Sequence, residues 1–274
     1  MRKPGTVIRV LAAVCALAAL LGGCRQSPAA ESQSGGDLPV IRVGCDTYPP
    51  YNYTGTDGRP AGIDIDLATE AFRRMGYQPK FVSIDWESKR TLVERGDIDC
   101  IWSSFSMDGR EDDYCWAGPY MASRQVVAVM RDSSIYTLAD LAGKTVAVQA
   151  TTKPEEIFLA GTAPRIPQLQ AVFSMQNREL IYPAMSKGYV DAVAAHETSV
   201  LQYMADYGVD YRILEEPLMV VGLGVAFARD DERGLAESLS DTLDGMRADG
   251  TTREILARYL PDPDPYLEVD SHED

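Results

Sequence analysis

The stretch Trp102-Ser103-Ser104-Phe105-Ser106-Met107-Asp108-Gly109-Arg110-Glu111 is the segment from which we interpret the rest of the chain. It follows a short apolar run, Asp97-Ile98-Asp99-Cys100-Ile101, that is typical of a buried strand. It precedes Glu111-Asp112-Asp113-Tyr114, and the spacing of Asp108 and Glu111 is a capping signal for the first turn of a short helix. We therefore predict a strand, a loop that exposes three serines, and a helix start.

This predicted loop favours an anion. Free backbone N–H groups and the positive end of a helix dipole meet at a helix start. Arg110 adds a planar guanidinium that matches a carboxylate. The alternative is an ordinary connection whose arginine pairs with a neighbouring acid, and the segment by itself does not separate the two interpretations.

The composition excludes several classes of protein. The 274 residues are 45% hydrophobic and 24% charged, which is enough to bury one large core or two smaller ones. A formal net charge of -15 repels phosphates, so we expect no nucleic-acid partner. Because the sequence has no nucleophile motif, phosphate-binding loop or cluster with metal-ligand spacing, we expect no cofactor and no metal.

The beginning of the chain has the features of a secretory signal. Residues 1–23 have a positively charged start, a mostly apolar stretch over 7–21 and a small-residue cleavage region. Leu21-Gly22-Gly23-Cys24 also resembles a bacterial lipobox, which implies that Cys24 is lipidated and becomes the mature N-terminus. Residues 24–38 are expected to be a flexible tether. We therefore expect an extracytoplasmic protein that a lipid anchors to the cell membrane.

The remaining cysteines do not suggest a disulfide framework. Cys15 leaves with the signal and Cys24 carries lipid, so Cys45, Cys100 and Cys115 remain. An odd number leaves at least one unpaired, and their spacing suits no metal site. We predict buried free thiols.

The rest of the chain alternates apolar strand patterns with helical patterns. The expected strands are 40–45, 81–84, 97–101, 125–130, 145–149, 171–173, 192–195 and 218–227. The expected helices are 63–75, 86–95, 154–159, 178–187, 198–207, 232–249 and 252–259. This order predicts an α/β protein with two similar series of elements. Ligands of open α/β sheets bind beyond the carboxyl ends of the strands, which places the expected site between the two series.

Several segments resemble, in order, the motifs of one known family. They are Val43-Gly44-Cys45-Asp46-Thr47-Tyr48-Pro49-Pro50-Tyr51, Gly62-Ile63-Asp64-Ile65-Asp66-Leu67-Ala68, residues 99–110, Ala117-Gly118-Pro119-Tyr120, residues 138–149, and Arg247-Ala248-Asp249-Gly250-Thr251 with Tyr259. Each motif is weak, but the ordered series is specific. The chain is similar to extracellular solute-binding proteins of polar-amino-acid ABC transporters.

The resemblance implies a two-lobed periplasmic-binding-protein-like fold. Two α/β lobes would be joined by two crossing strands, with the ligand cleft between them and closing by a hinge motion. We expect residues 39–127 and 222–262 to form the first lobe and residues 128–221 the second. An acidic tail over 263–274 is expected to be loose.

The resemblance also implies which residues contact the ligand. Arg110 matches the arginine that grips the ligand's α-carboxylate, although it stands one residue closer to Ser106 than is usual. Ser104 and Ser106 match loop residues that hydrogen-bond the ligand. Thr151 and Thr152 match a carboxylate contact from the second lobe.

Three more residues match the side-chain pocket of the family. Tyr48 and Trp86 match its aromatic or apolar walls, and Asp46 matches an acid at its floor. Two alternatives stay open, because Trp86 also suits a core position at a helix start and Asp46 also suits a cap of the turn before Pro49.

One position departs from the family pattern. After Val190-Asp191-Ala192-Val193-Ala194-Ala195 the family usually has an aspartate for the ligand's α-ammonium, whereas this chain has His196 followed by Glu197. A neutral His196 would accept one hydrogen bond while Glu197 or Asp46 supplies the negative charge. Alternatively, the ligand has no α-ammonium and His196 is a cation, or His196 only caps the next helix.

The resemblance implies a non-enzymatic, monomeric binding protein that captures a small amino acid by cleft closure and delivers it to a membrane permease. The alternative is an enzyme similar to cyclohexadienyl dehydratases that uses the same cleft. His196 and Glu197 would then be the candidates for a general acid or base.

Overall fold

The computed structural model describes residues 38–161 and 165–269. The predicted signal peptide (1–23), the expected lipidation site Cys24 and the predicted tether apart from Leu38 lie outside these residues. Within the described ranges, no helix is long and apolar enough to cross a membrane.

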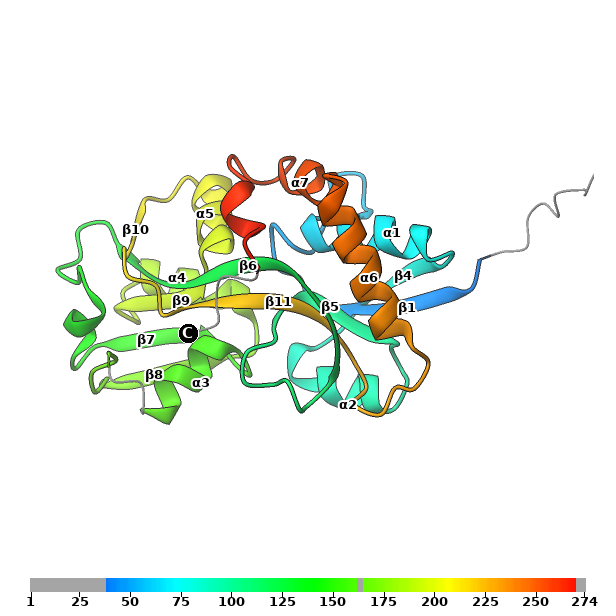
Figure 1. Cartoon of the computed structure of the whole chain (residues 1–274). Coiled ribbons are helices and arrows are strands. Elements are labelled where there is room, and N and C mark those ends of the chain that lie inside the picture. Colours follow the sequence, from blue (N-terminus) through cyan, green and yellow to red (C-terminus); the bar gives the residue numbers. More distant parts are fainter. Residues whose placement is uncertain (1–37, 162–164, 270–274) are drawn as a thin grey trace, which may run out of the picture. The chain divides into compact units, whose positions relative to one another are not determined.

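The described part of the chain contains one large mixed sheet (Figure 1). Its hydrogen-bonded order is β4 (Gln78–Ser83), β1 (Val40–Cys45), β5 (Cys100–Ser106), β11 (Met219–Phe227), β6 (Cys115–Met130), β9 (Ala192–His196), β7 (Thr145–Gln149) and β8 (Ala171–Met175), with β10 (Tyr211–Ile213) paired to β6. β1 is parallel to β4 and β5, and β7 is parallel to β8 and β9. β11 and β6, which join these two parallel groups, are antiparallel to their neighbours.

The two long strands β6 and β11 run between two hydrophobic cores (Figure 1). On β6, Met121 packs in the first core and Val126 in the second. On β11, the change falls between Leu218, which precedes the strand, and Val221. The predicted lobe boundaries at 127/128 and 221/222 therefore lie slightly too late. β6 has the polar residues Ser123-Arg124-Gln125 just before this change, whereas β11 has only apolar residues and glycines, so the sequence of β11 does not mark where its neighbours change.

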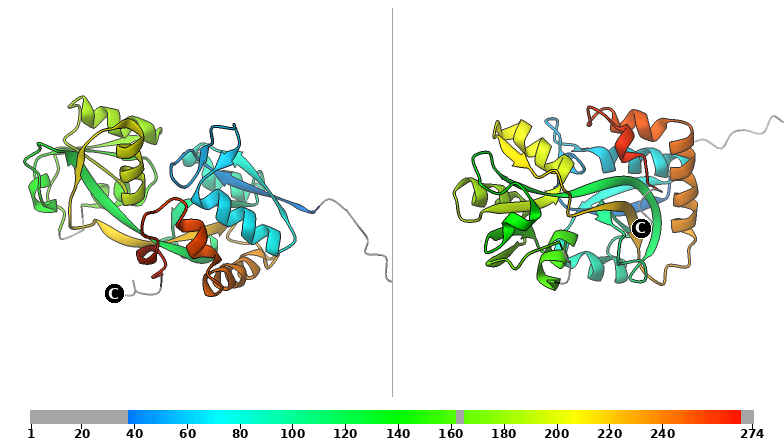
Figure 2. Two further views of the ribbon diagram at one scale, coloured as in Figure 1. Left: turned by 90° about the horizontal axis from the view of Figure 1, so that it is seen from above. Right: turned by 60° about the vertical axis from the view of Figure 1, so that its left-hand side comes forward.

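Helices cover both lobes. The first lobe contains α1 (Ile63–Arg74), α2 (Lys89–Glu94), α6 (Leu235–Ala248) and α7 (Thr251–Leu256), and the second contains α3 (Lys153–Ala160), α4 (Ile181–Ser186) and α5 (Glu197–Tyr207). Single turns of 3-10 helix are Trp86–Ser88, Leu138–Leu141, Arg178–Leu180 and Asp264–Tyr266, and β2 (Tyr53–Thr54) pairs with β3 (Pro60–Ala61). Figure 2 shows α6 and α7 on the same lobe as α1, so the chain returns to the first lobe as expected.

The segment predicted as an exposed serine-rich loop is instead part of a buried strand. β5 continues to Ser106, and Ser103 and Ser104 are 1% and 4% exposed. Both faces of β5 are covered, because Trp102 packs against Phe72 of α1 and Phe105 packs against Trp86. The strand therefore buries its small hydroxyl groups together with its aromatic residues, and the alternation of polar and apolar residues gave no sign of this.

The helix predicted to begin at 111 is also absent, and this segment is a turn that leads into β6. The two carboxylates expected to cap it have other partners. Asp108 Oδ2 accepts from the Gly222 N–H at 3.1 Å, and Glu111 Oε1 accepts from the Gly109 N–H at 2.8 Å.

The beginning of the predicted loose tail is ordered in the described residues. Asp264–Tyr266 form a short 3-10 turn, and Arg253 Nε donates to Asp264 Oδ1 at 2.7 Å. Tyr266 and Leu267 pack against the first core. These two apolar side chains hold residues 263–269 on the first lobe, while 270–274 lie outside the described residues.

The three cysteines of the described chain are free thiols, as predicted. Cys45 and Cys100 are buried, and Cys115 is half-buried.

Candidate functional site

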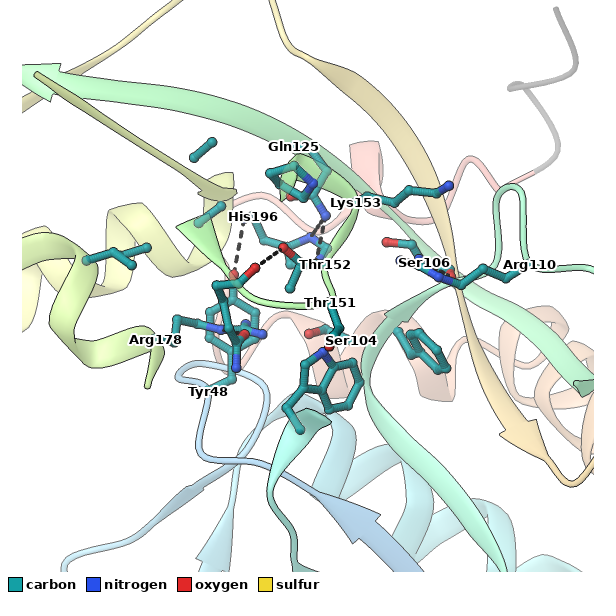
Figure 3. A pocket seen from close by; sticks show the side chains of 17 residues that line it. Tyr48, Ser104, Ser106, Arg110, Gln125, Thr151, Thr152, Lys153, Arg178 and His196 are labelled. Carbon is teal, nitrogen blue, oxygen red and sulfur yellow. Dashed lines mark hydrogen bonds between the residues drawn. The ribbon is translucent and has the colours of Figure 1, made fainter. Parts of the chain in front are cut away.

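A cavity lies between the two lobes, near the carboxyl ends of β5, β7 and β9, and is called the interlobe cavity below (Figure 3). Eight of the ten residues proposed from the sequence line it, namely Tyr48, Trp86, Ser104, Ser106, Arg110, Thr151, Thr152 and His196. The remaining lining residues are Phe105, Gln125, Gln149, Lys153, Pro154, Arg178, Ile181, Ala194 and Ala195. Asp46 and Glu197 do not line the cavity.

Arg110 stands at one end of the cavity, beside Ser106 (Figure 3). Its Nη1 donates to the Ser106 carbonyl oxygen at 3.3 Å, and its Nη2 lies 3.6 Å from Glu156 Oε2. Burial lowers the pKa of Arg110 below its ordinary value, and Glu156 opposes that effect. A guanidinium has five N–H donors, so these two long contacts leave donors for an anion.

Arg178 stands at the opposite end, against Tyr48 (Figure 3). Its Cζ lies 3.0 Å from the centroid of the Tyr48 ring, its Nε donates to Gln149 Oε1, and its Nη2 lies 3.7 Å from Asp46 Oδ2. Its Nη1 is buried and has no hydrogen-bond partner. Our sequence reasoning missed this residue. Its position shortly after β8 was the available signal, because ligand contacts gather beyond the carboxyl ends of parallel strands.

Asp46, expected at the floor of the pocket, lies behind the Arg178 end. Its Oδ1 accepts from Ser103 Oγ at 2.6 Å, and its Oδ2 accepts from Gln149 Nε2 at 3.1 Å. Donors of the protein itself therefore occupy this carboxylate.

Two cavity residues have left-handed backbone conformations that side chains rarely adopt, Ser104 with φ 44° and Thr151 with φ 58°. Carboxylates hold both in place. The Ser104 N–H donates to Asp64 Oδ2 at 2.7 Å, and the Thr151 N–H donates to Glu155 Oε2 at 2.6 Å. Burial raises the pKa of Asp64 to about 6. The orientation of Ser104 in the cavity wall is thus set from beneath the site.

Two lysines add positive charge beside the cavity, and neither was predicted. Lys89 Nζ lies 4.5 Å from the centroid of the Trp86 ring and donates to Thr151 Oγ1 at 2.8 Å. Burial and the nearby Arg110 lower the pKa of Lys89 to about 8. Lys153, in the cavity wall, donates to Glu156 Oε1 at 2.7 Å.

His196 lies buried in the cavity wall at the end of β9. Its Nδ1 is 2.8 Å from Ser123 Oγ, its Nε2 is 3.0 Å from Gln125 Nε2, and its backbone N–H donates to the Tyr48 hydroxyl at 3.1 Å. Burial, with Arg178 as a second cause, lowers the pKa of His196 to about 3. His196 is therefore uncharged near neutral pH, which favours its role as a neutral acceptor over that of a cation. It occupies the N-cap position of α5, but its side chain makes no capping hydrogen bond.

The side chain of Glu197 leaves the cavity. Its Oε1 accepts from Arg124 Nη1 at 2.7 Å, and both residues line a separate cavity with residues of the C-terminal segment. Because Glu197 begins α5 directly after β9, it points away from the direction of His196. The expectation that Glu197 supplies charge to the ligand is not met by this geometry.

Four buried polar atoms of the cavity wall have no hydrogen-bond partner: Trp86 Nε1, Ser104 Oγ, Gln125 Oε1 and Arg178 Nη1. An unsatisfied buried polar group costs about 1–3 kcal/mol. These atoms include both donors and acceptors, so the wall is built for a polar ligand with groups of both kinds. Across 38–161 and 165–269, no group of three or more His, Cys, Asp or Glu side chains is arranged to hold a metal ion.

The chain is similar to known binding proteins along most of its length. The histidine-binding periplasmic protein of Salmonella typhimurium is 32% identical over 234 residues, which cover 80% of this chain and 87% of the relative. A solved substrate-binding protein of an ABC uptake transporter from Streptococcus pneumoniae, with bound histidine, is 26% identical with a TM-score of 0.74. That match covers 81% of this chain and 93% of the other.

A third likeness concerns the fold alone. The solved ancestral amino acid-binding protein AncCDT-1, a precursor of cyclohexadienyl dehydratase, is 24% identical with a TM-score of 0.71. The match covers 80% of this chain and 95% of the other. The family model of bacterial extracellular solute-binding proteins, family 3, matches residues 41–262, and the chain therefore belongs to this family.

Proposed function

We propose that this chain captures a small amino acid outside the cytoplasmic membrane and delivers it to the membrane permease of an ABC transporter. The single observation that carries the proposal is the set of four unpartnered polar atoms in the interlobe cavity. The relatives support the class of ligand, because one is named a histidine-binding protein and another holds bound histidine.

The cavity offers complementary groups for both ends of an amino acid. Arg110 has free guanidinium donors for the α-carboxylate. Ser104 Oγ and Gln125 Oε1 are unpartnered oxygens that suit an α-ammonium, and the uncharged His196 ring lies beside Gln125. These neutral acceptors replace the aspartate expected at the position of His196.

We infer that the two lobes close on the ligand, because residues of both lobes form the cavity wall and contact one another across it. Tyr48 and Lys89 belong to the first lobe, and they contact His196 and Thr151 of the second. The cavity is therefore complete only when the lobes are together, and separation would open it to solvent.

The alternative enzyme lacks a paired acid and base in this geometry. The Glu197 carboxylate faces Arg124 outside the cavity, so it does not lie beside the His196 ring. With its pKa near 3, His196 is a weak base at neutral pH. We therefore propose binding without catalysis.

A thermal-shift screen of the twenty amino acids and prephenate tests this function. A ligand at a hundred times its Kd should stabilise the protein by about 2.7 kcal/mol. A shift with at least one amino acid supports the proposal. Turnover of prephenate, or no shift with any amino acid, would overturn it.

We also propose that the chain acts as a monomer and is held at the membrane by lipid on Cys24. We expect Cys24→Ser to release the protein from the membrane fraction or to leave the signal uncleaved. Membrane fractionation and the mass of the mature N-terminus measure this. Normal processing and membrane retention of the variant would contradict the lipobox interpretation.

A further inference from the structure

The interlobe cavity has an unequal balance of charge. Three cationic side chains line it, Arg110, Lys153 and Arg178, and no aspartate or glutamate is among its lining residues. Lys89 adds a fourth cation through its hydrogen bond to Thr151. A zwitterionic amino acid with an uncharged side chain would bring only one carboxylate to these cations.

Four acids, Glu156, Asp46, Asp64 and Glu155, lie outside the wall and offset this positive charge from behind. Glu156 accepts from Lys153 and lies 3.6 Å from Arg110 Nη2, and Asp46 lies 3.7 Å from Arg178 Nη2. Asp64 and Glu155 accept from the backbone N–H groups of Ser104 and Thr151, so these four carboxylates stand behind the wall while the charged side chains of the wall itself are cationic. A carboxylate of the ligand would meet these cations directly.

The two guanidinium groups stand at opposite ends of the cavity (Figure 3). Arg110 keeps free donors at one end, and the Nη1 of Arg178 is buried without a partner at the other. Arg178 is only 7% exposed, and Tyr48 and Gln149 hold it from both sides. It is therefore a fixed cation of the cavity wall with an unused donor, since a surface arginine would be free to turn toward water.

We propose that the ligand carries two carboxylates, one at Arg110 and one at Arg178. This inference rests on the proposed function and narrows its ligand class to dicarboxylates. A cationic ligand side chain is excluded from the Tyr48 end, because Arg178 already stacks there and already contacts Asp46. Ser104 Oγ and Gln125 Oε1 would accept from an α-ammonium if the dicarboxylate has one.

Titration calorimetry on the mature protein tests the inference with six probes. They are L-glutamate, L-aspartate, L-glutamine, L-histidine, L-arginine and glutarate. Glutamine has the shape of glutamate without its second charge, and glutarate has both carboxylates without the ammonium. We expect one of the dicarboxylates to bind at least tenfold more tightly than glutamine, histidine and arginine. The ratio of glutamate to glutarate then reports whether the ligand has an ammonium.

Arg178→Gln should weaken dicarboxylate binding by about thirty-fold or more, since truncating one partner of a desolvated charge pair has effects of this size. Glutamine binding should change by less than about threefold. Arg178→Lys, which keeps the charge but loses the planar fork, should retain part of the preference. Arg165→Gln is the matched control, because Arg165 is an exposed arginine of the same lobe that pairs with Glu216.

The outcomes separate this inference from the proposed function. If a neutral or cationic amino acid binds most tightly, the dicarboxylate inference is wrong and the proposed function stands. An unchanged preference in folded Arg178→Gln, checked by its melting temperature, would also overturn the inference. If Arg178→Gln does not fold, the probe ranking of the wild type and of Arg178→Lys decides. Absence of binding by all six probes would overturn the inference, and the screen of all amino acids then tests the function.

Discussion

The two arginine ends of the interlobe cavity are built in different ways. Arg110 and the Ser106 carbonyl that it contacts come from neighbouring positions on the first lobe. Arg178 comes from the second lobe, but it stacks on Tyr48 and faces Asp46, both of which follow β1 of the first lobe. The hydrogen bond of Arg110 therefore lies within one lobe, and only its longer contact with Glu156 of α3 crosses to the second. At the other end, both the ring contact and the ion pair of Arg178 cross between the lobes.

This difference assigns the two ends different parts in binding. The hydrogen bond between Arg110 and the Ser106 carbonyl needs no residue of the second lobe, so Arg110 offers the first contact to a ligand carboxylate. The Arg178 end is complete only when Tyr48 and Asp46 lie against it, so a carboxylate there stabilises the closed arrangement. Loss of Arg110 should weaken every carboxylate ligand, whereas loss of Arg178 should be selective for the second charge.

Arg110→Ala should have the largest effect. Truncating a desolvated charge pair costs about 2–5 kcal/mol, or roughly thirty-fold to several-thousand-fold in Kd. Because the α-carboxylate is common to all amino acids, L-glutamate and L-glutamine should lose affinity by similar factors in titration calorimetry. Arg110→Lys should not restore it fully, because an ammonium lacks the two-pronged geometry.

Arg90→Gln provides the matched control, since Arg90 is an exposed arginine of the first lobe paired with Glu94 and Asp113. Its affinities should equal those of the wild type. Near-normal binding by a folded Arg110→Ala variant would remove Arg110 from the site and would leave the two ends without their proposed difference.

The sequence predicted the Arg110 end better than the Arg178 end for a physical reason. Arg110, Ser104 and Ser106 lie within seven residues and follow one apolar run, so a local pattern brings them together. Arg178, Asp46 and Gln149 follow three separate strands, and only the sheet order makes them neighbours.

The fold could be predicted from the sequence better than the details of the site, because the fold depends on an apolar periodicity that recurs along the chain. The strands expected at 40–45 and 145–149 are confirmed by β1 and β7. The prediction that the end of β5 is an exposed loop was wrong because this strand is covered on both faces. Such a strand lacks the alternation of polar and apolar residues that reveals a half-buried strand. The neighbours of Glu197 were likewise hidden, because its partner Arg124 lies 73 residues away in the sequence.

Asp46→Asn should strengthen the binding of a ligand carboxylate at Arg178. The substitution removes the carboxylate 3.7 Å from Arg178 Nη2, so a ligand carboxylate meets a less compensated guanidinium. We expect L-glutamate affinity to rise by about tenfold, or on the order of 1.4 kcal/mol. The asparagine oxygen can still accept from Ser103 Oγ, but its NH2 group then faces the Gln149 NH2 group, so one hydrogen bond is lost and the melting temperature of the variant must be checked. Calorimetry with glutamine is the control, and equal gains for both ligands would contradict a charge effect.

A smaller effect should appear with rising pH. The pKa of Lys89 is about 8, and a bound anion favours its charged form. Affinity for a dicarboxylate should therefore be full below pH 8 and fall by about tenfold at pH 9, because Lys89 must regain a proton to attract the ligand. The other charged groups acting on Lys89 are Arg110, Asp46, Glu87 and Arg178. Titration calorimetry below pH 8 and at pH 9 should show no such fall in affinity for Lys89→Met. If the affinity of this variant still falls, a group other than Lys89 causes the pH dependence.

His196 should have the smallest effect on binding, although it lies between the two ends. With its pKa at about 3, the His196 ring stays uncharged between pH 8 and pH 5.5, so its protonation does not change the affinity over that interval. In titration calorimetry, the ratio of the wild-type affinity to the His196→Gln affinity should therefore be the same at pH 8 and at pH 5.5.

The free energy of unfolding should nevertheless depend on pH because the His196 ring is buried. Histidine in the unfolded chain has a pKa near 6.5, so below that pH the unfolded chain binds a proton that His196 in the folded protein does not bind. The contribution to stability is present above pH 6.5 and is lost as pH falls toward 3. Between pH 7 and pH 5 the wild type should lose about 2 kcal/mol relative to His196→Gln in urea unfolding. Asp64, whose raised pKa acts in the opposite direction near pH 6, is present in both proteins and cancels in their difference. Parallel pH profiles of stability would mean that His196 is protonated in the folded state, and the neutral wall between the two arginines would then carry a third cation.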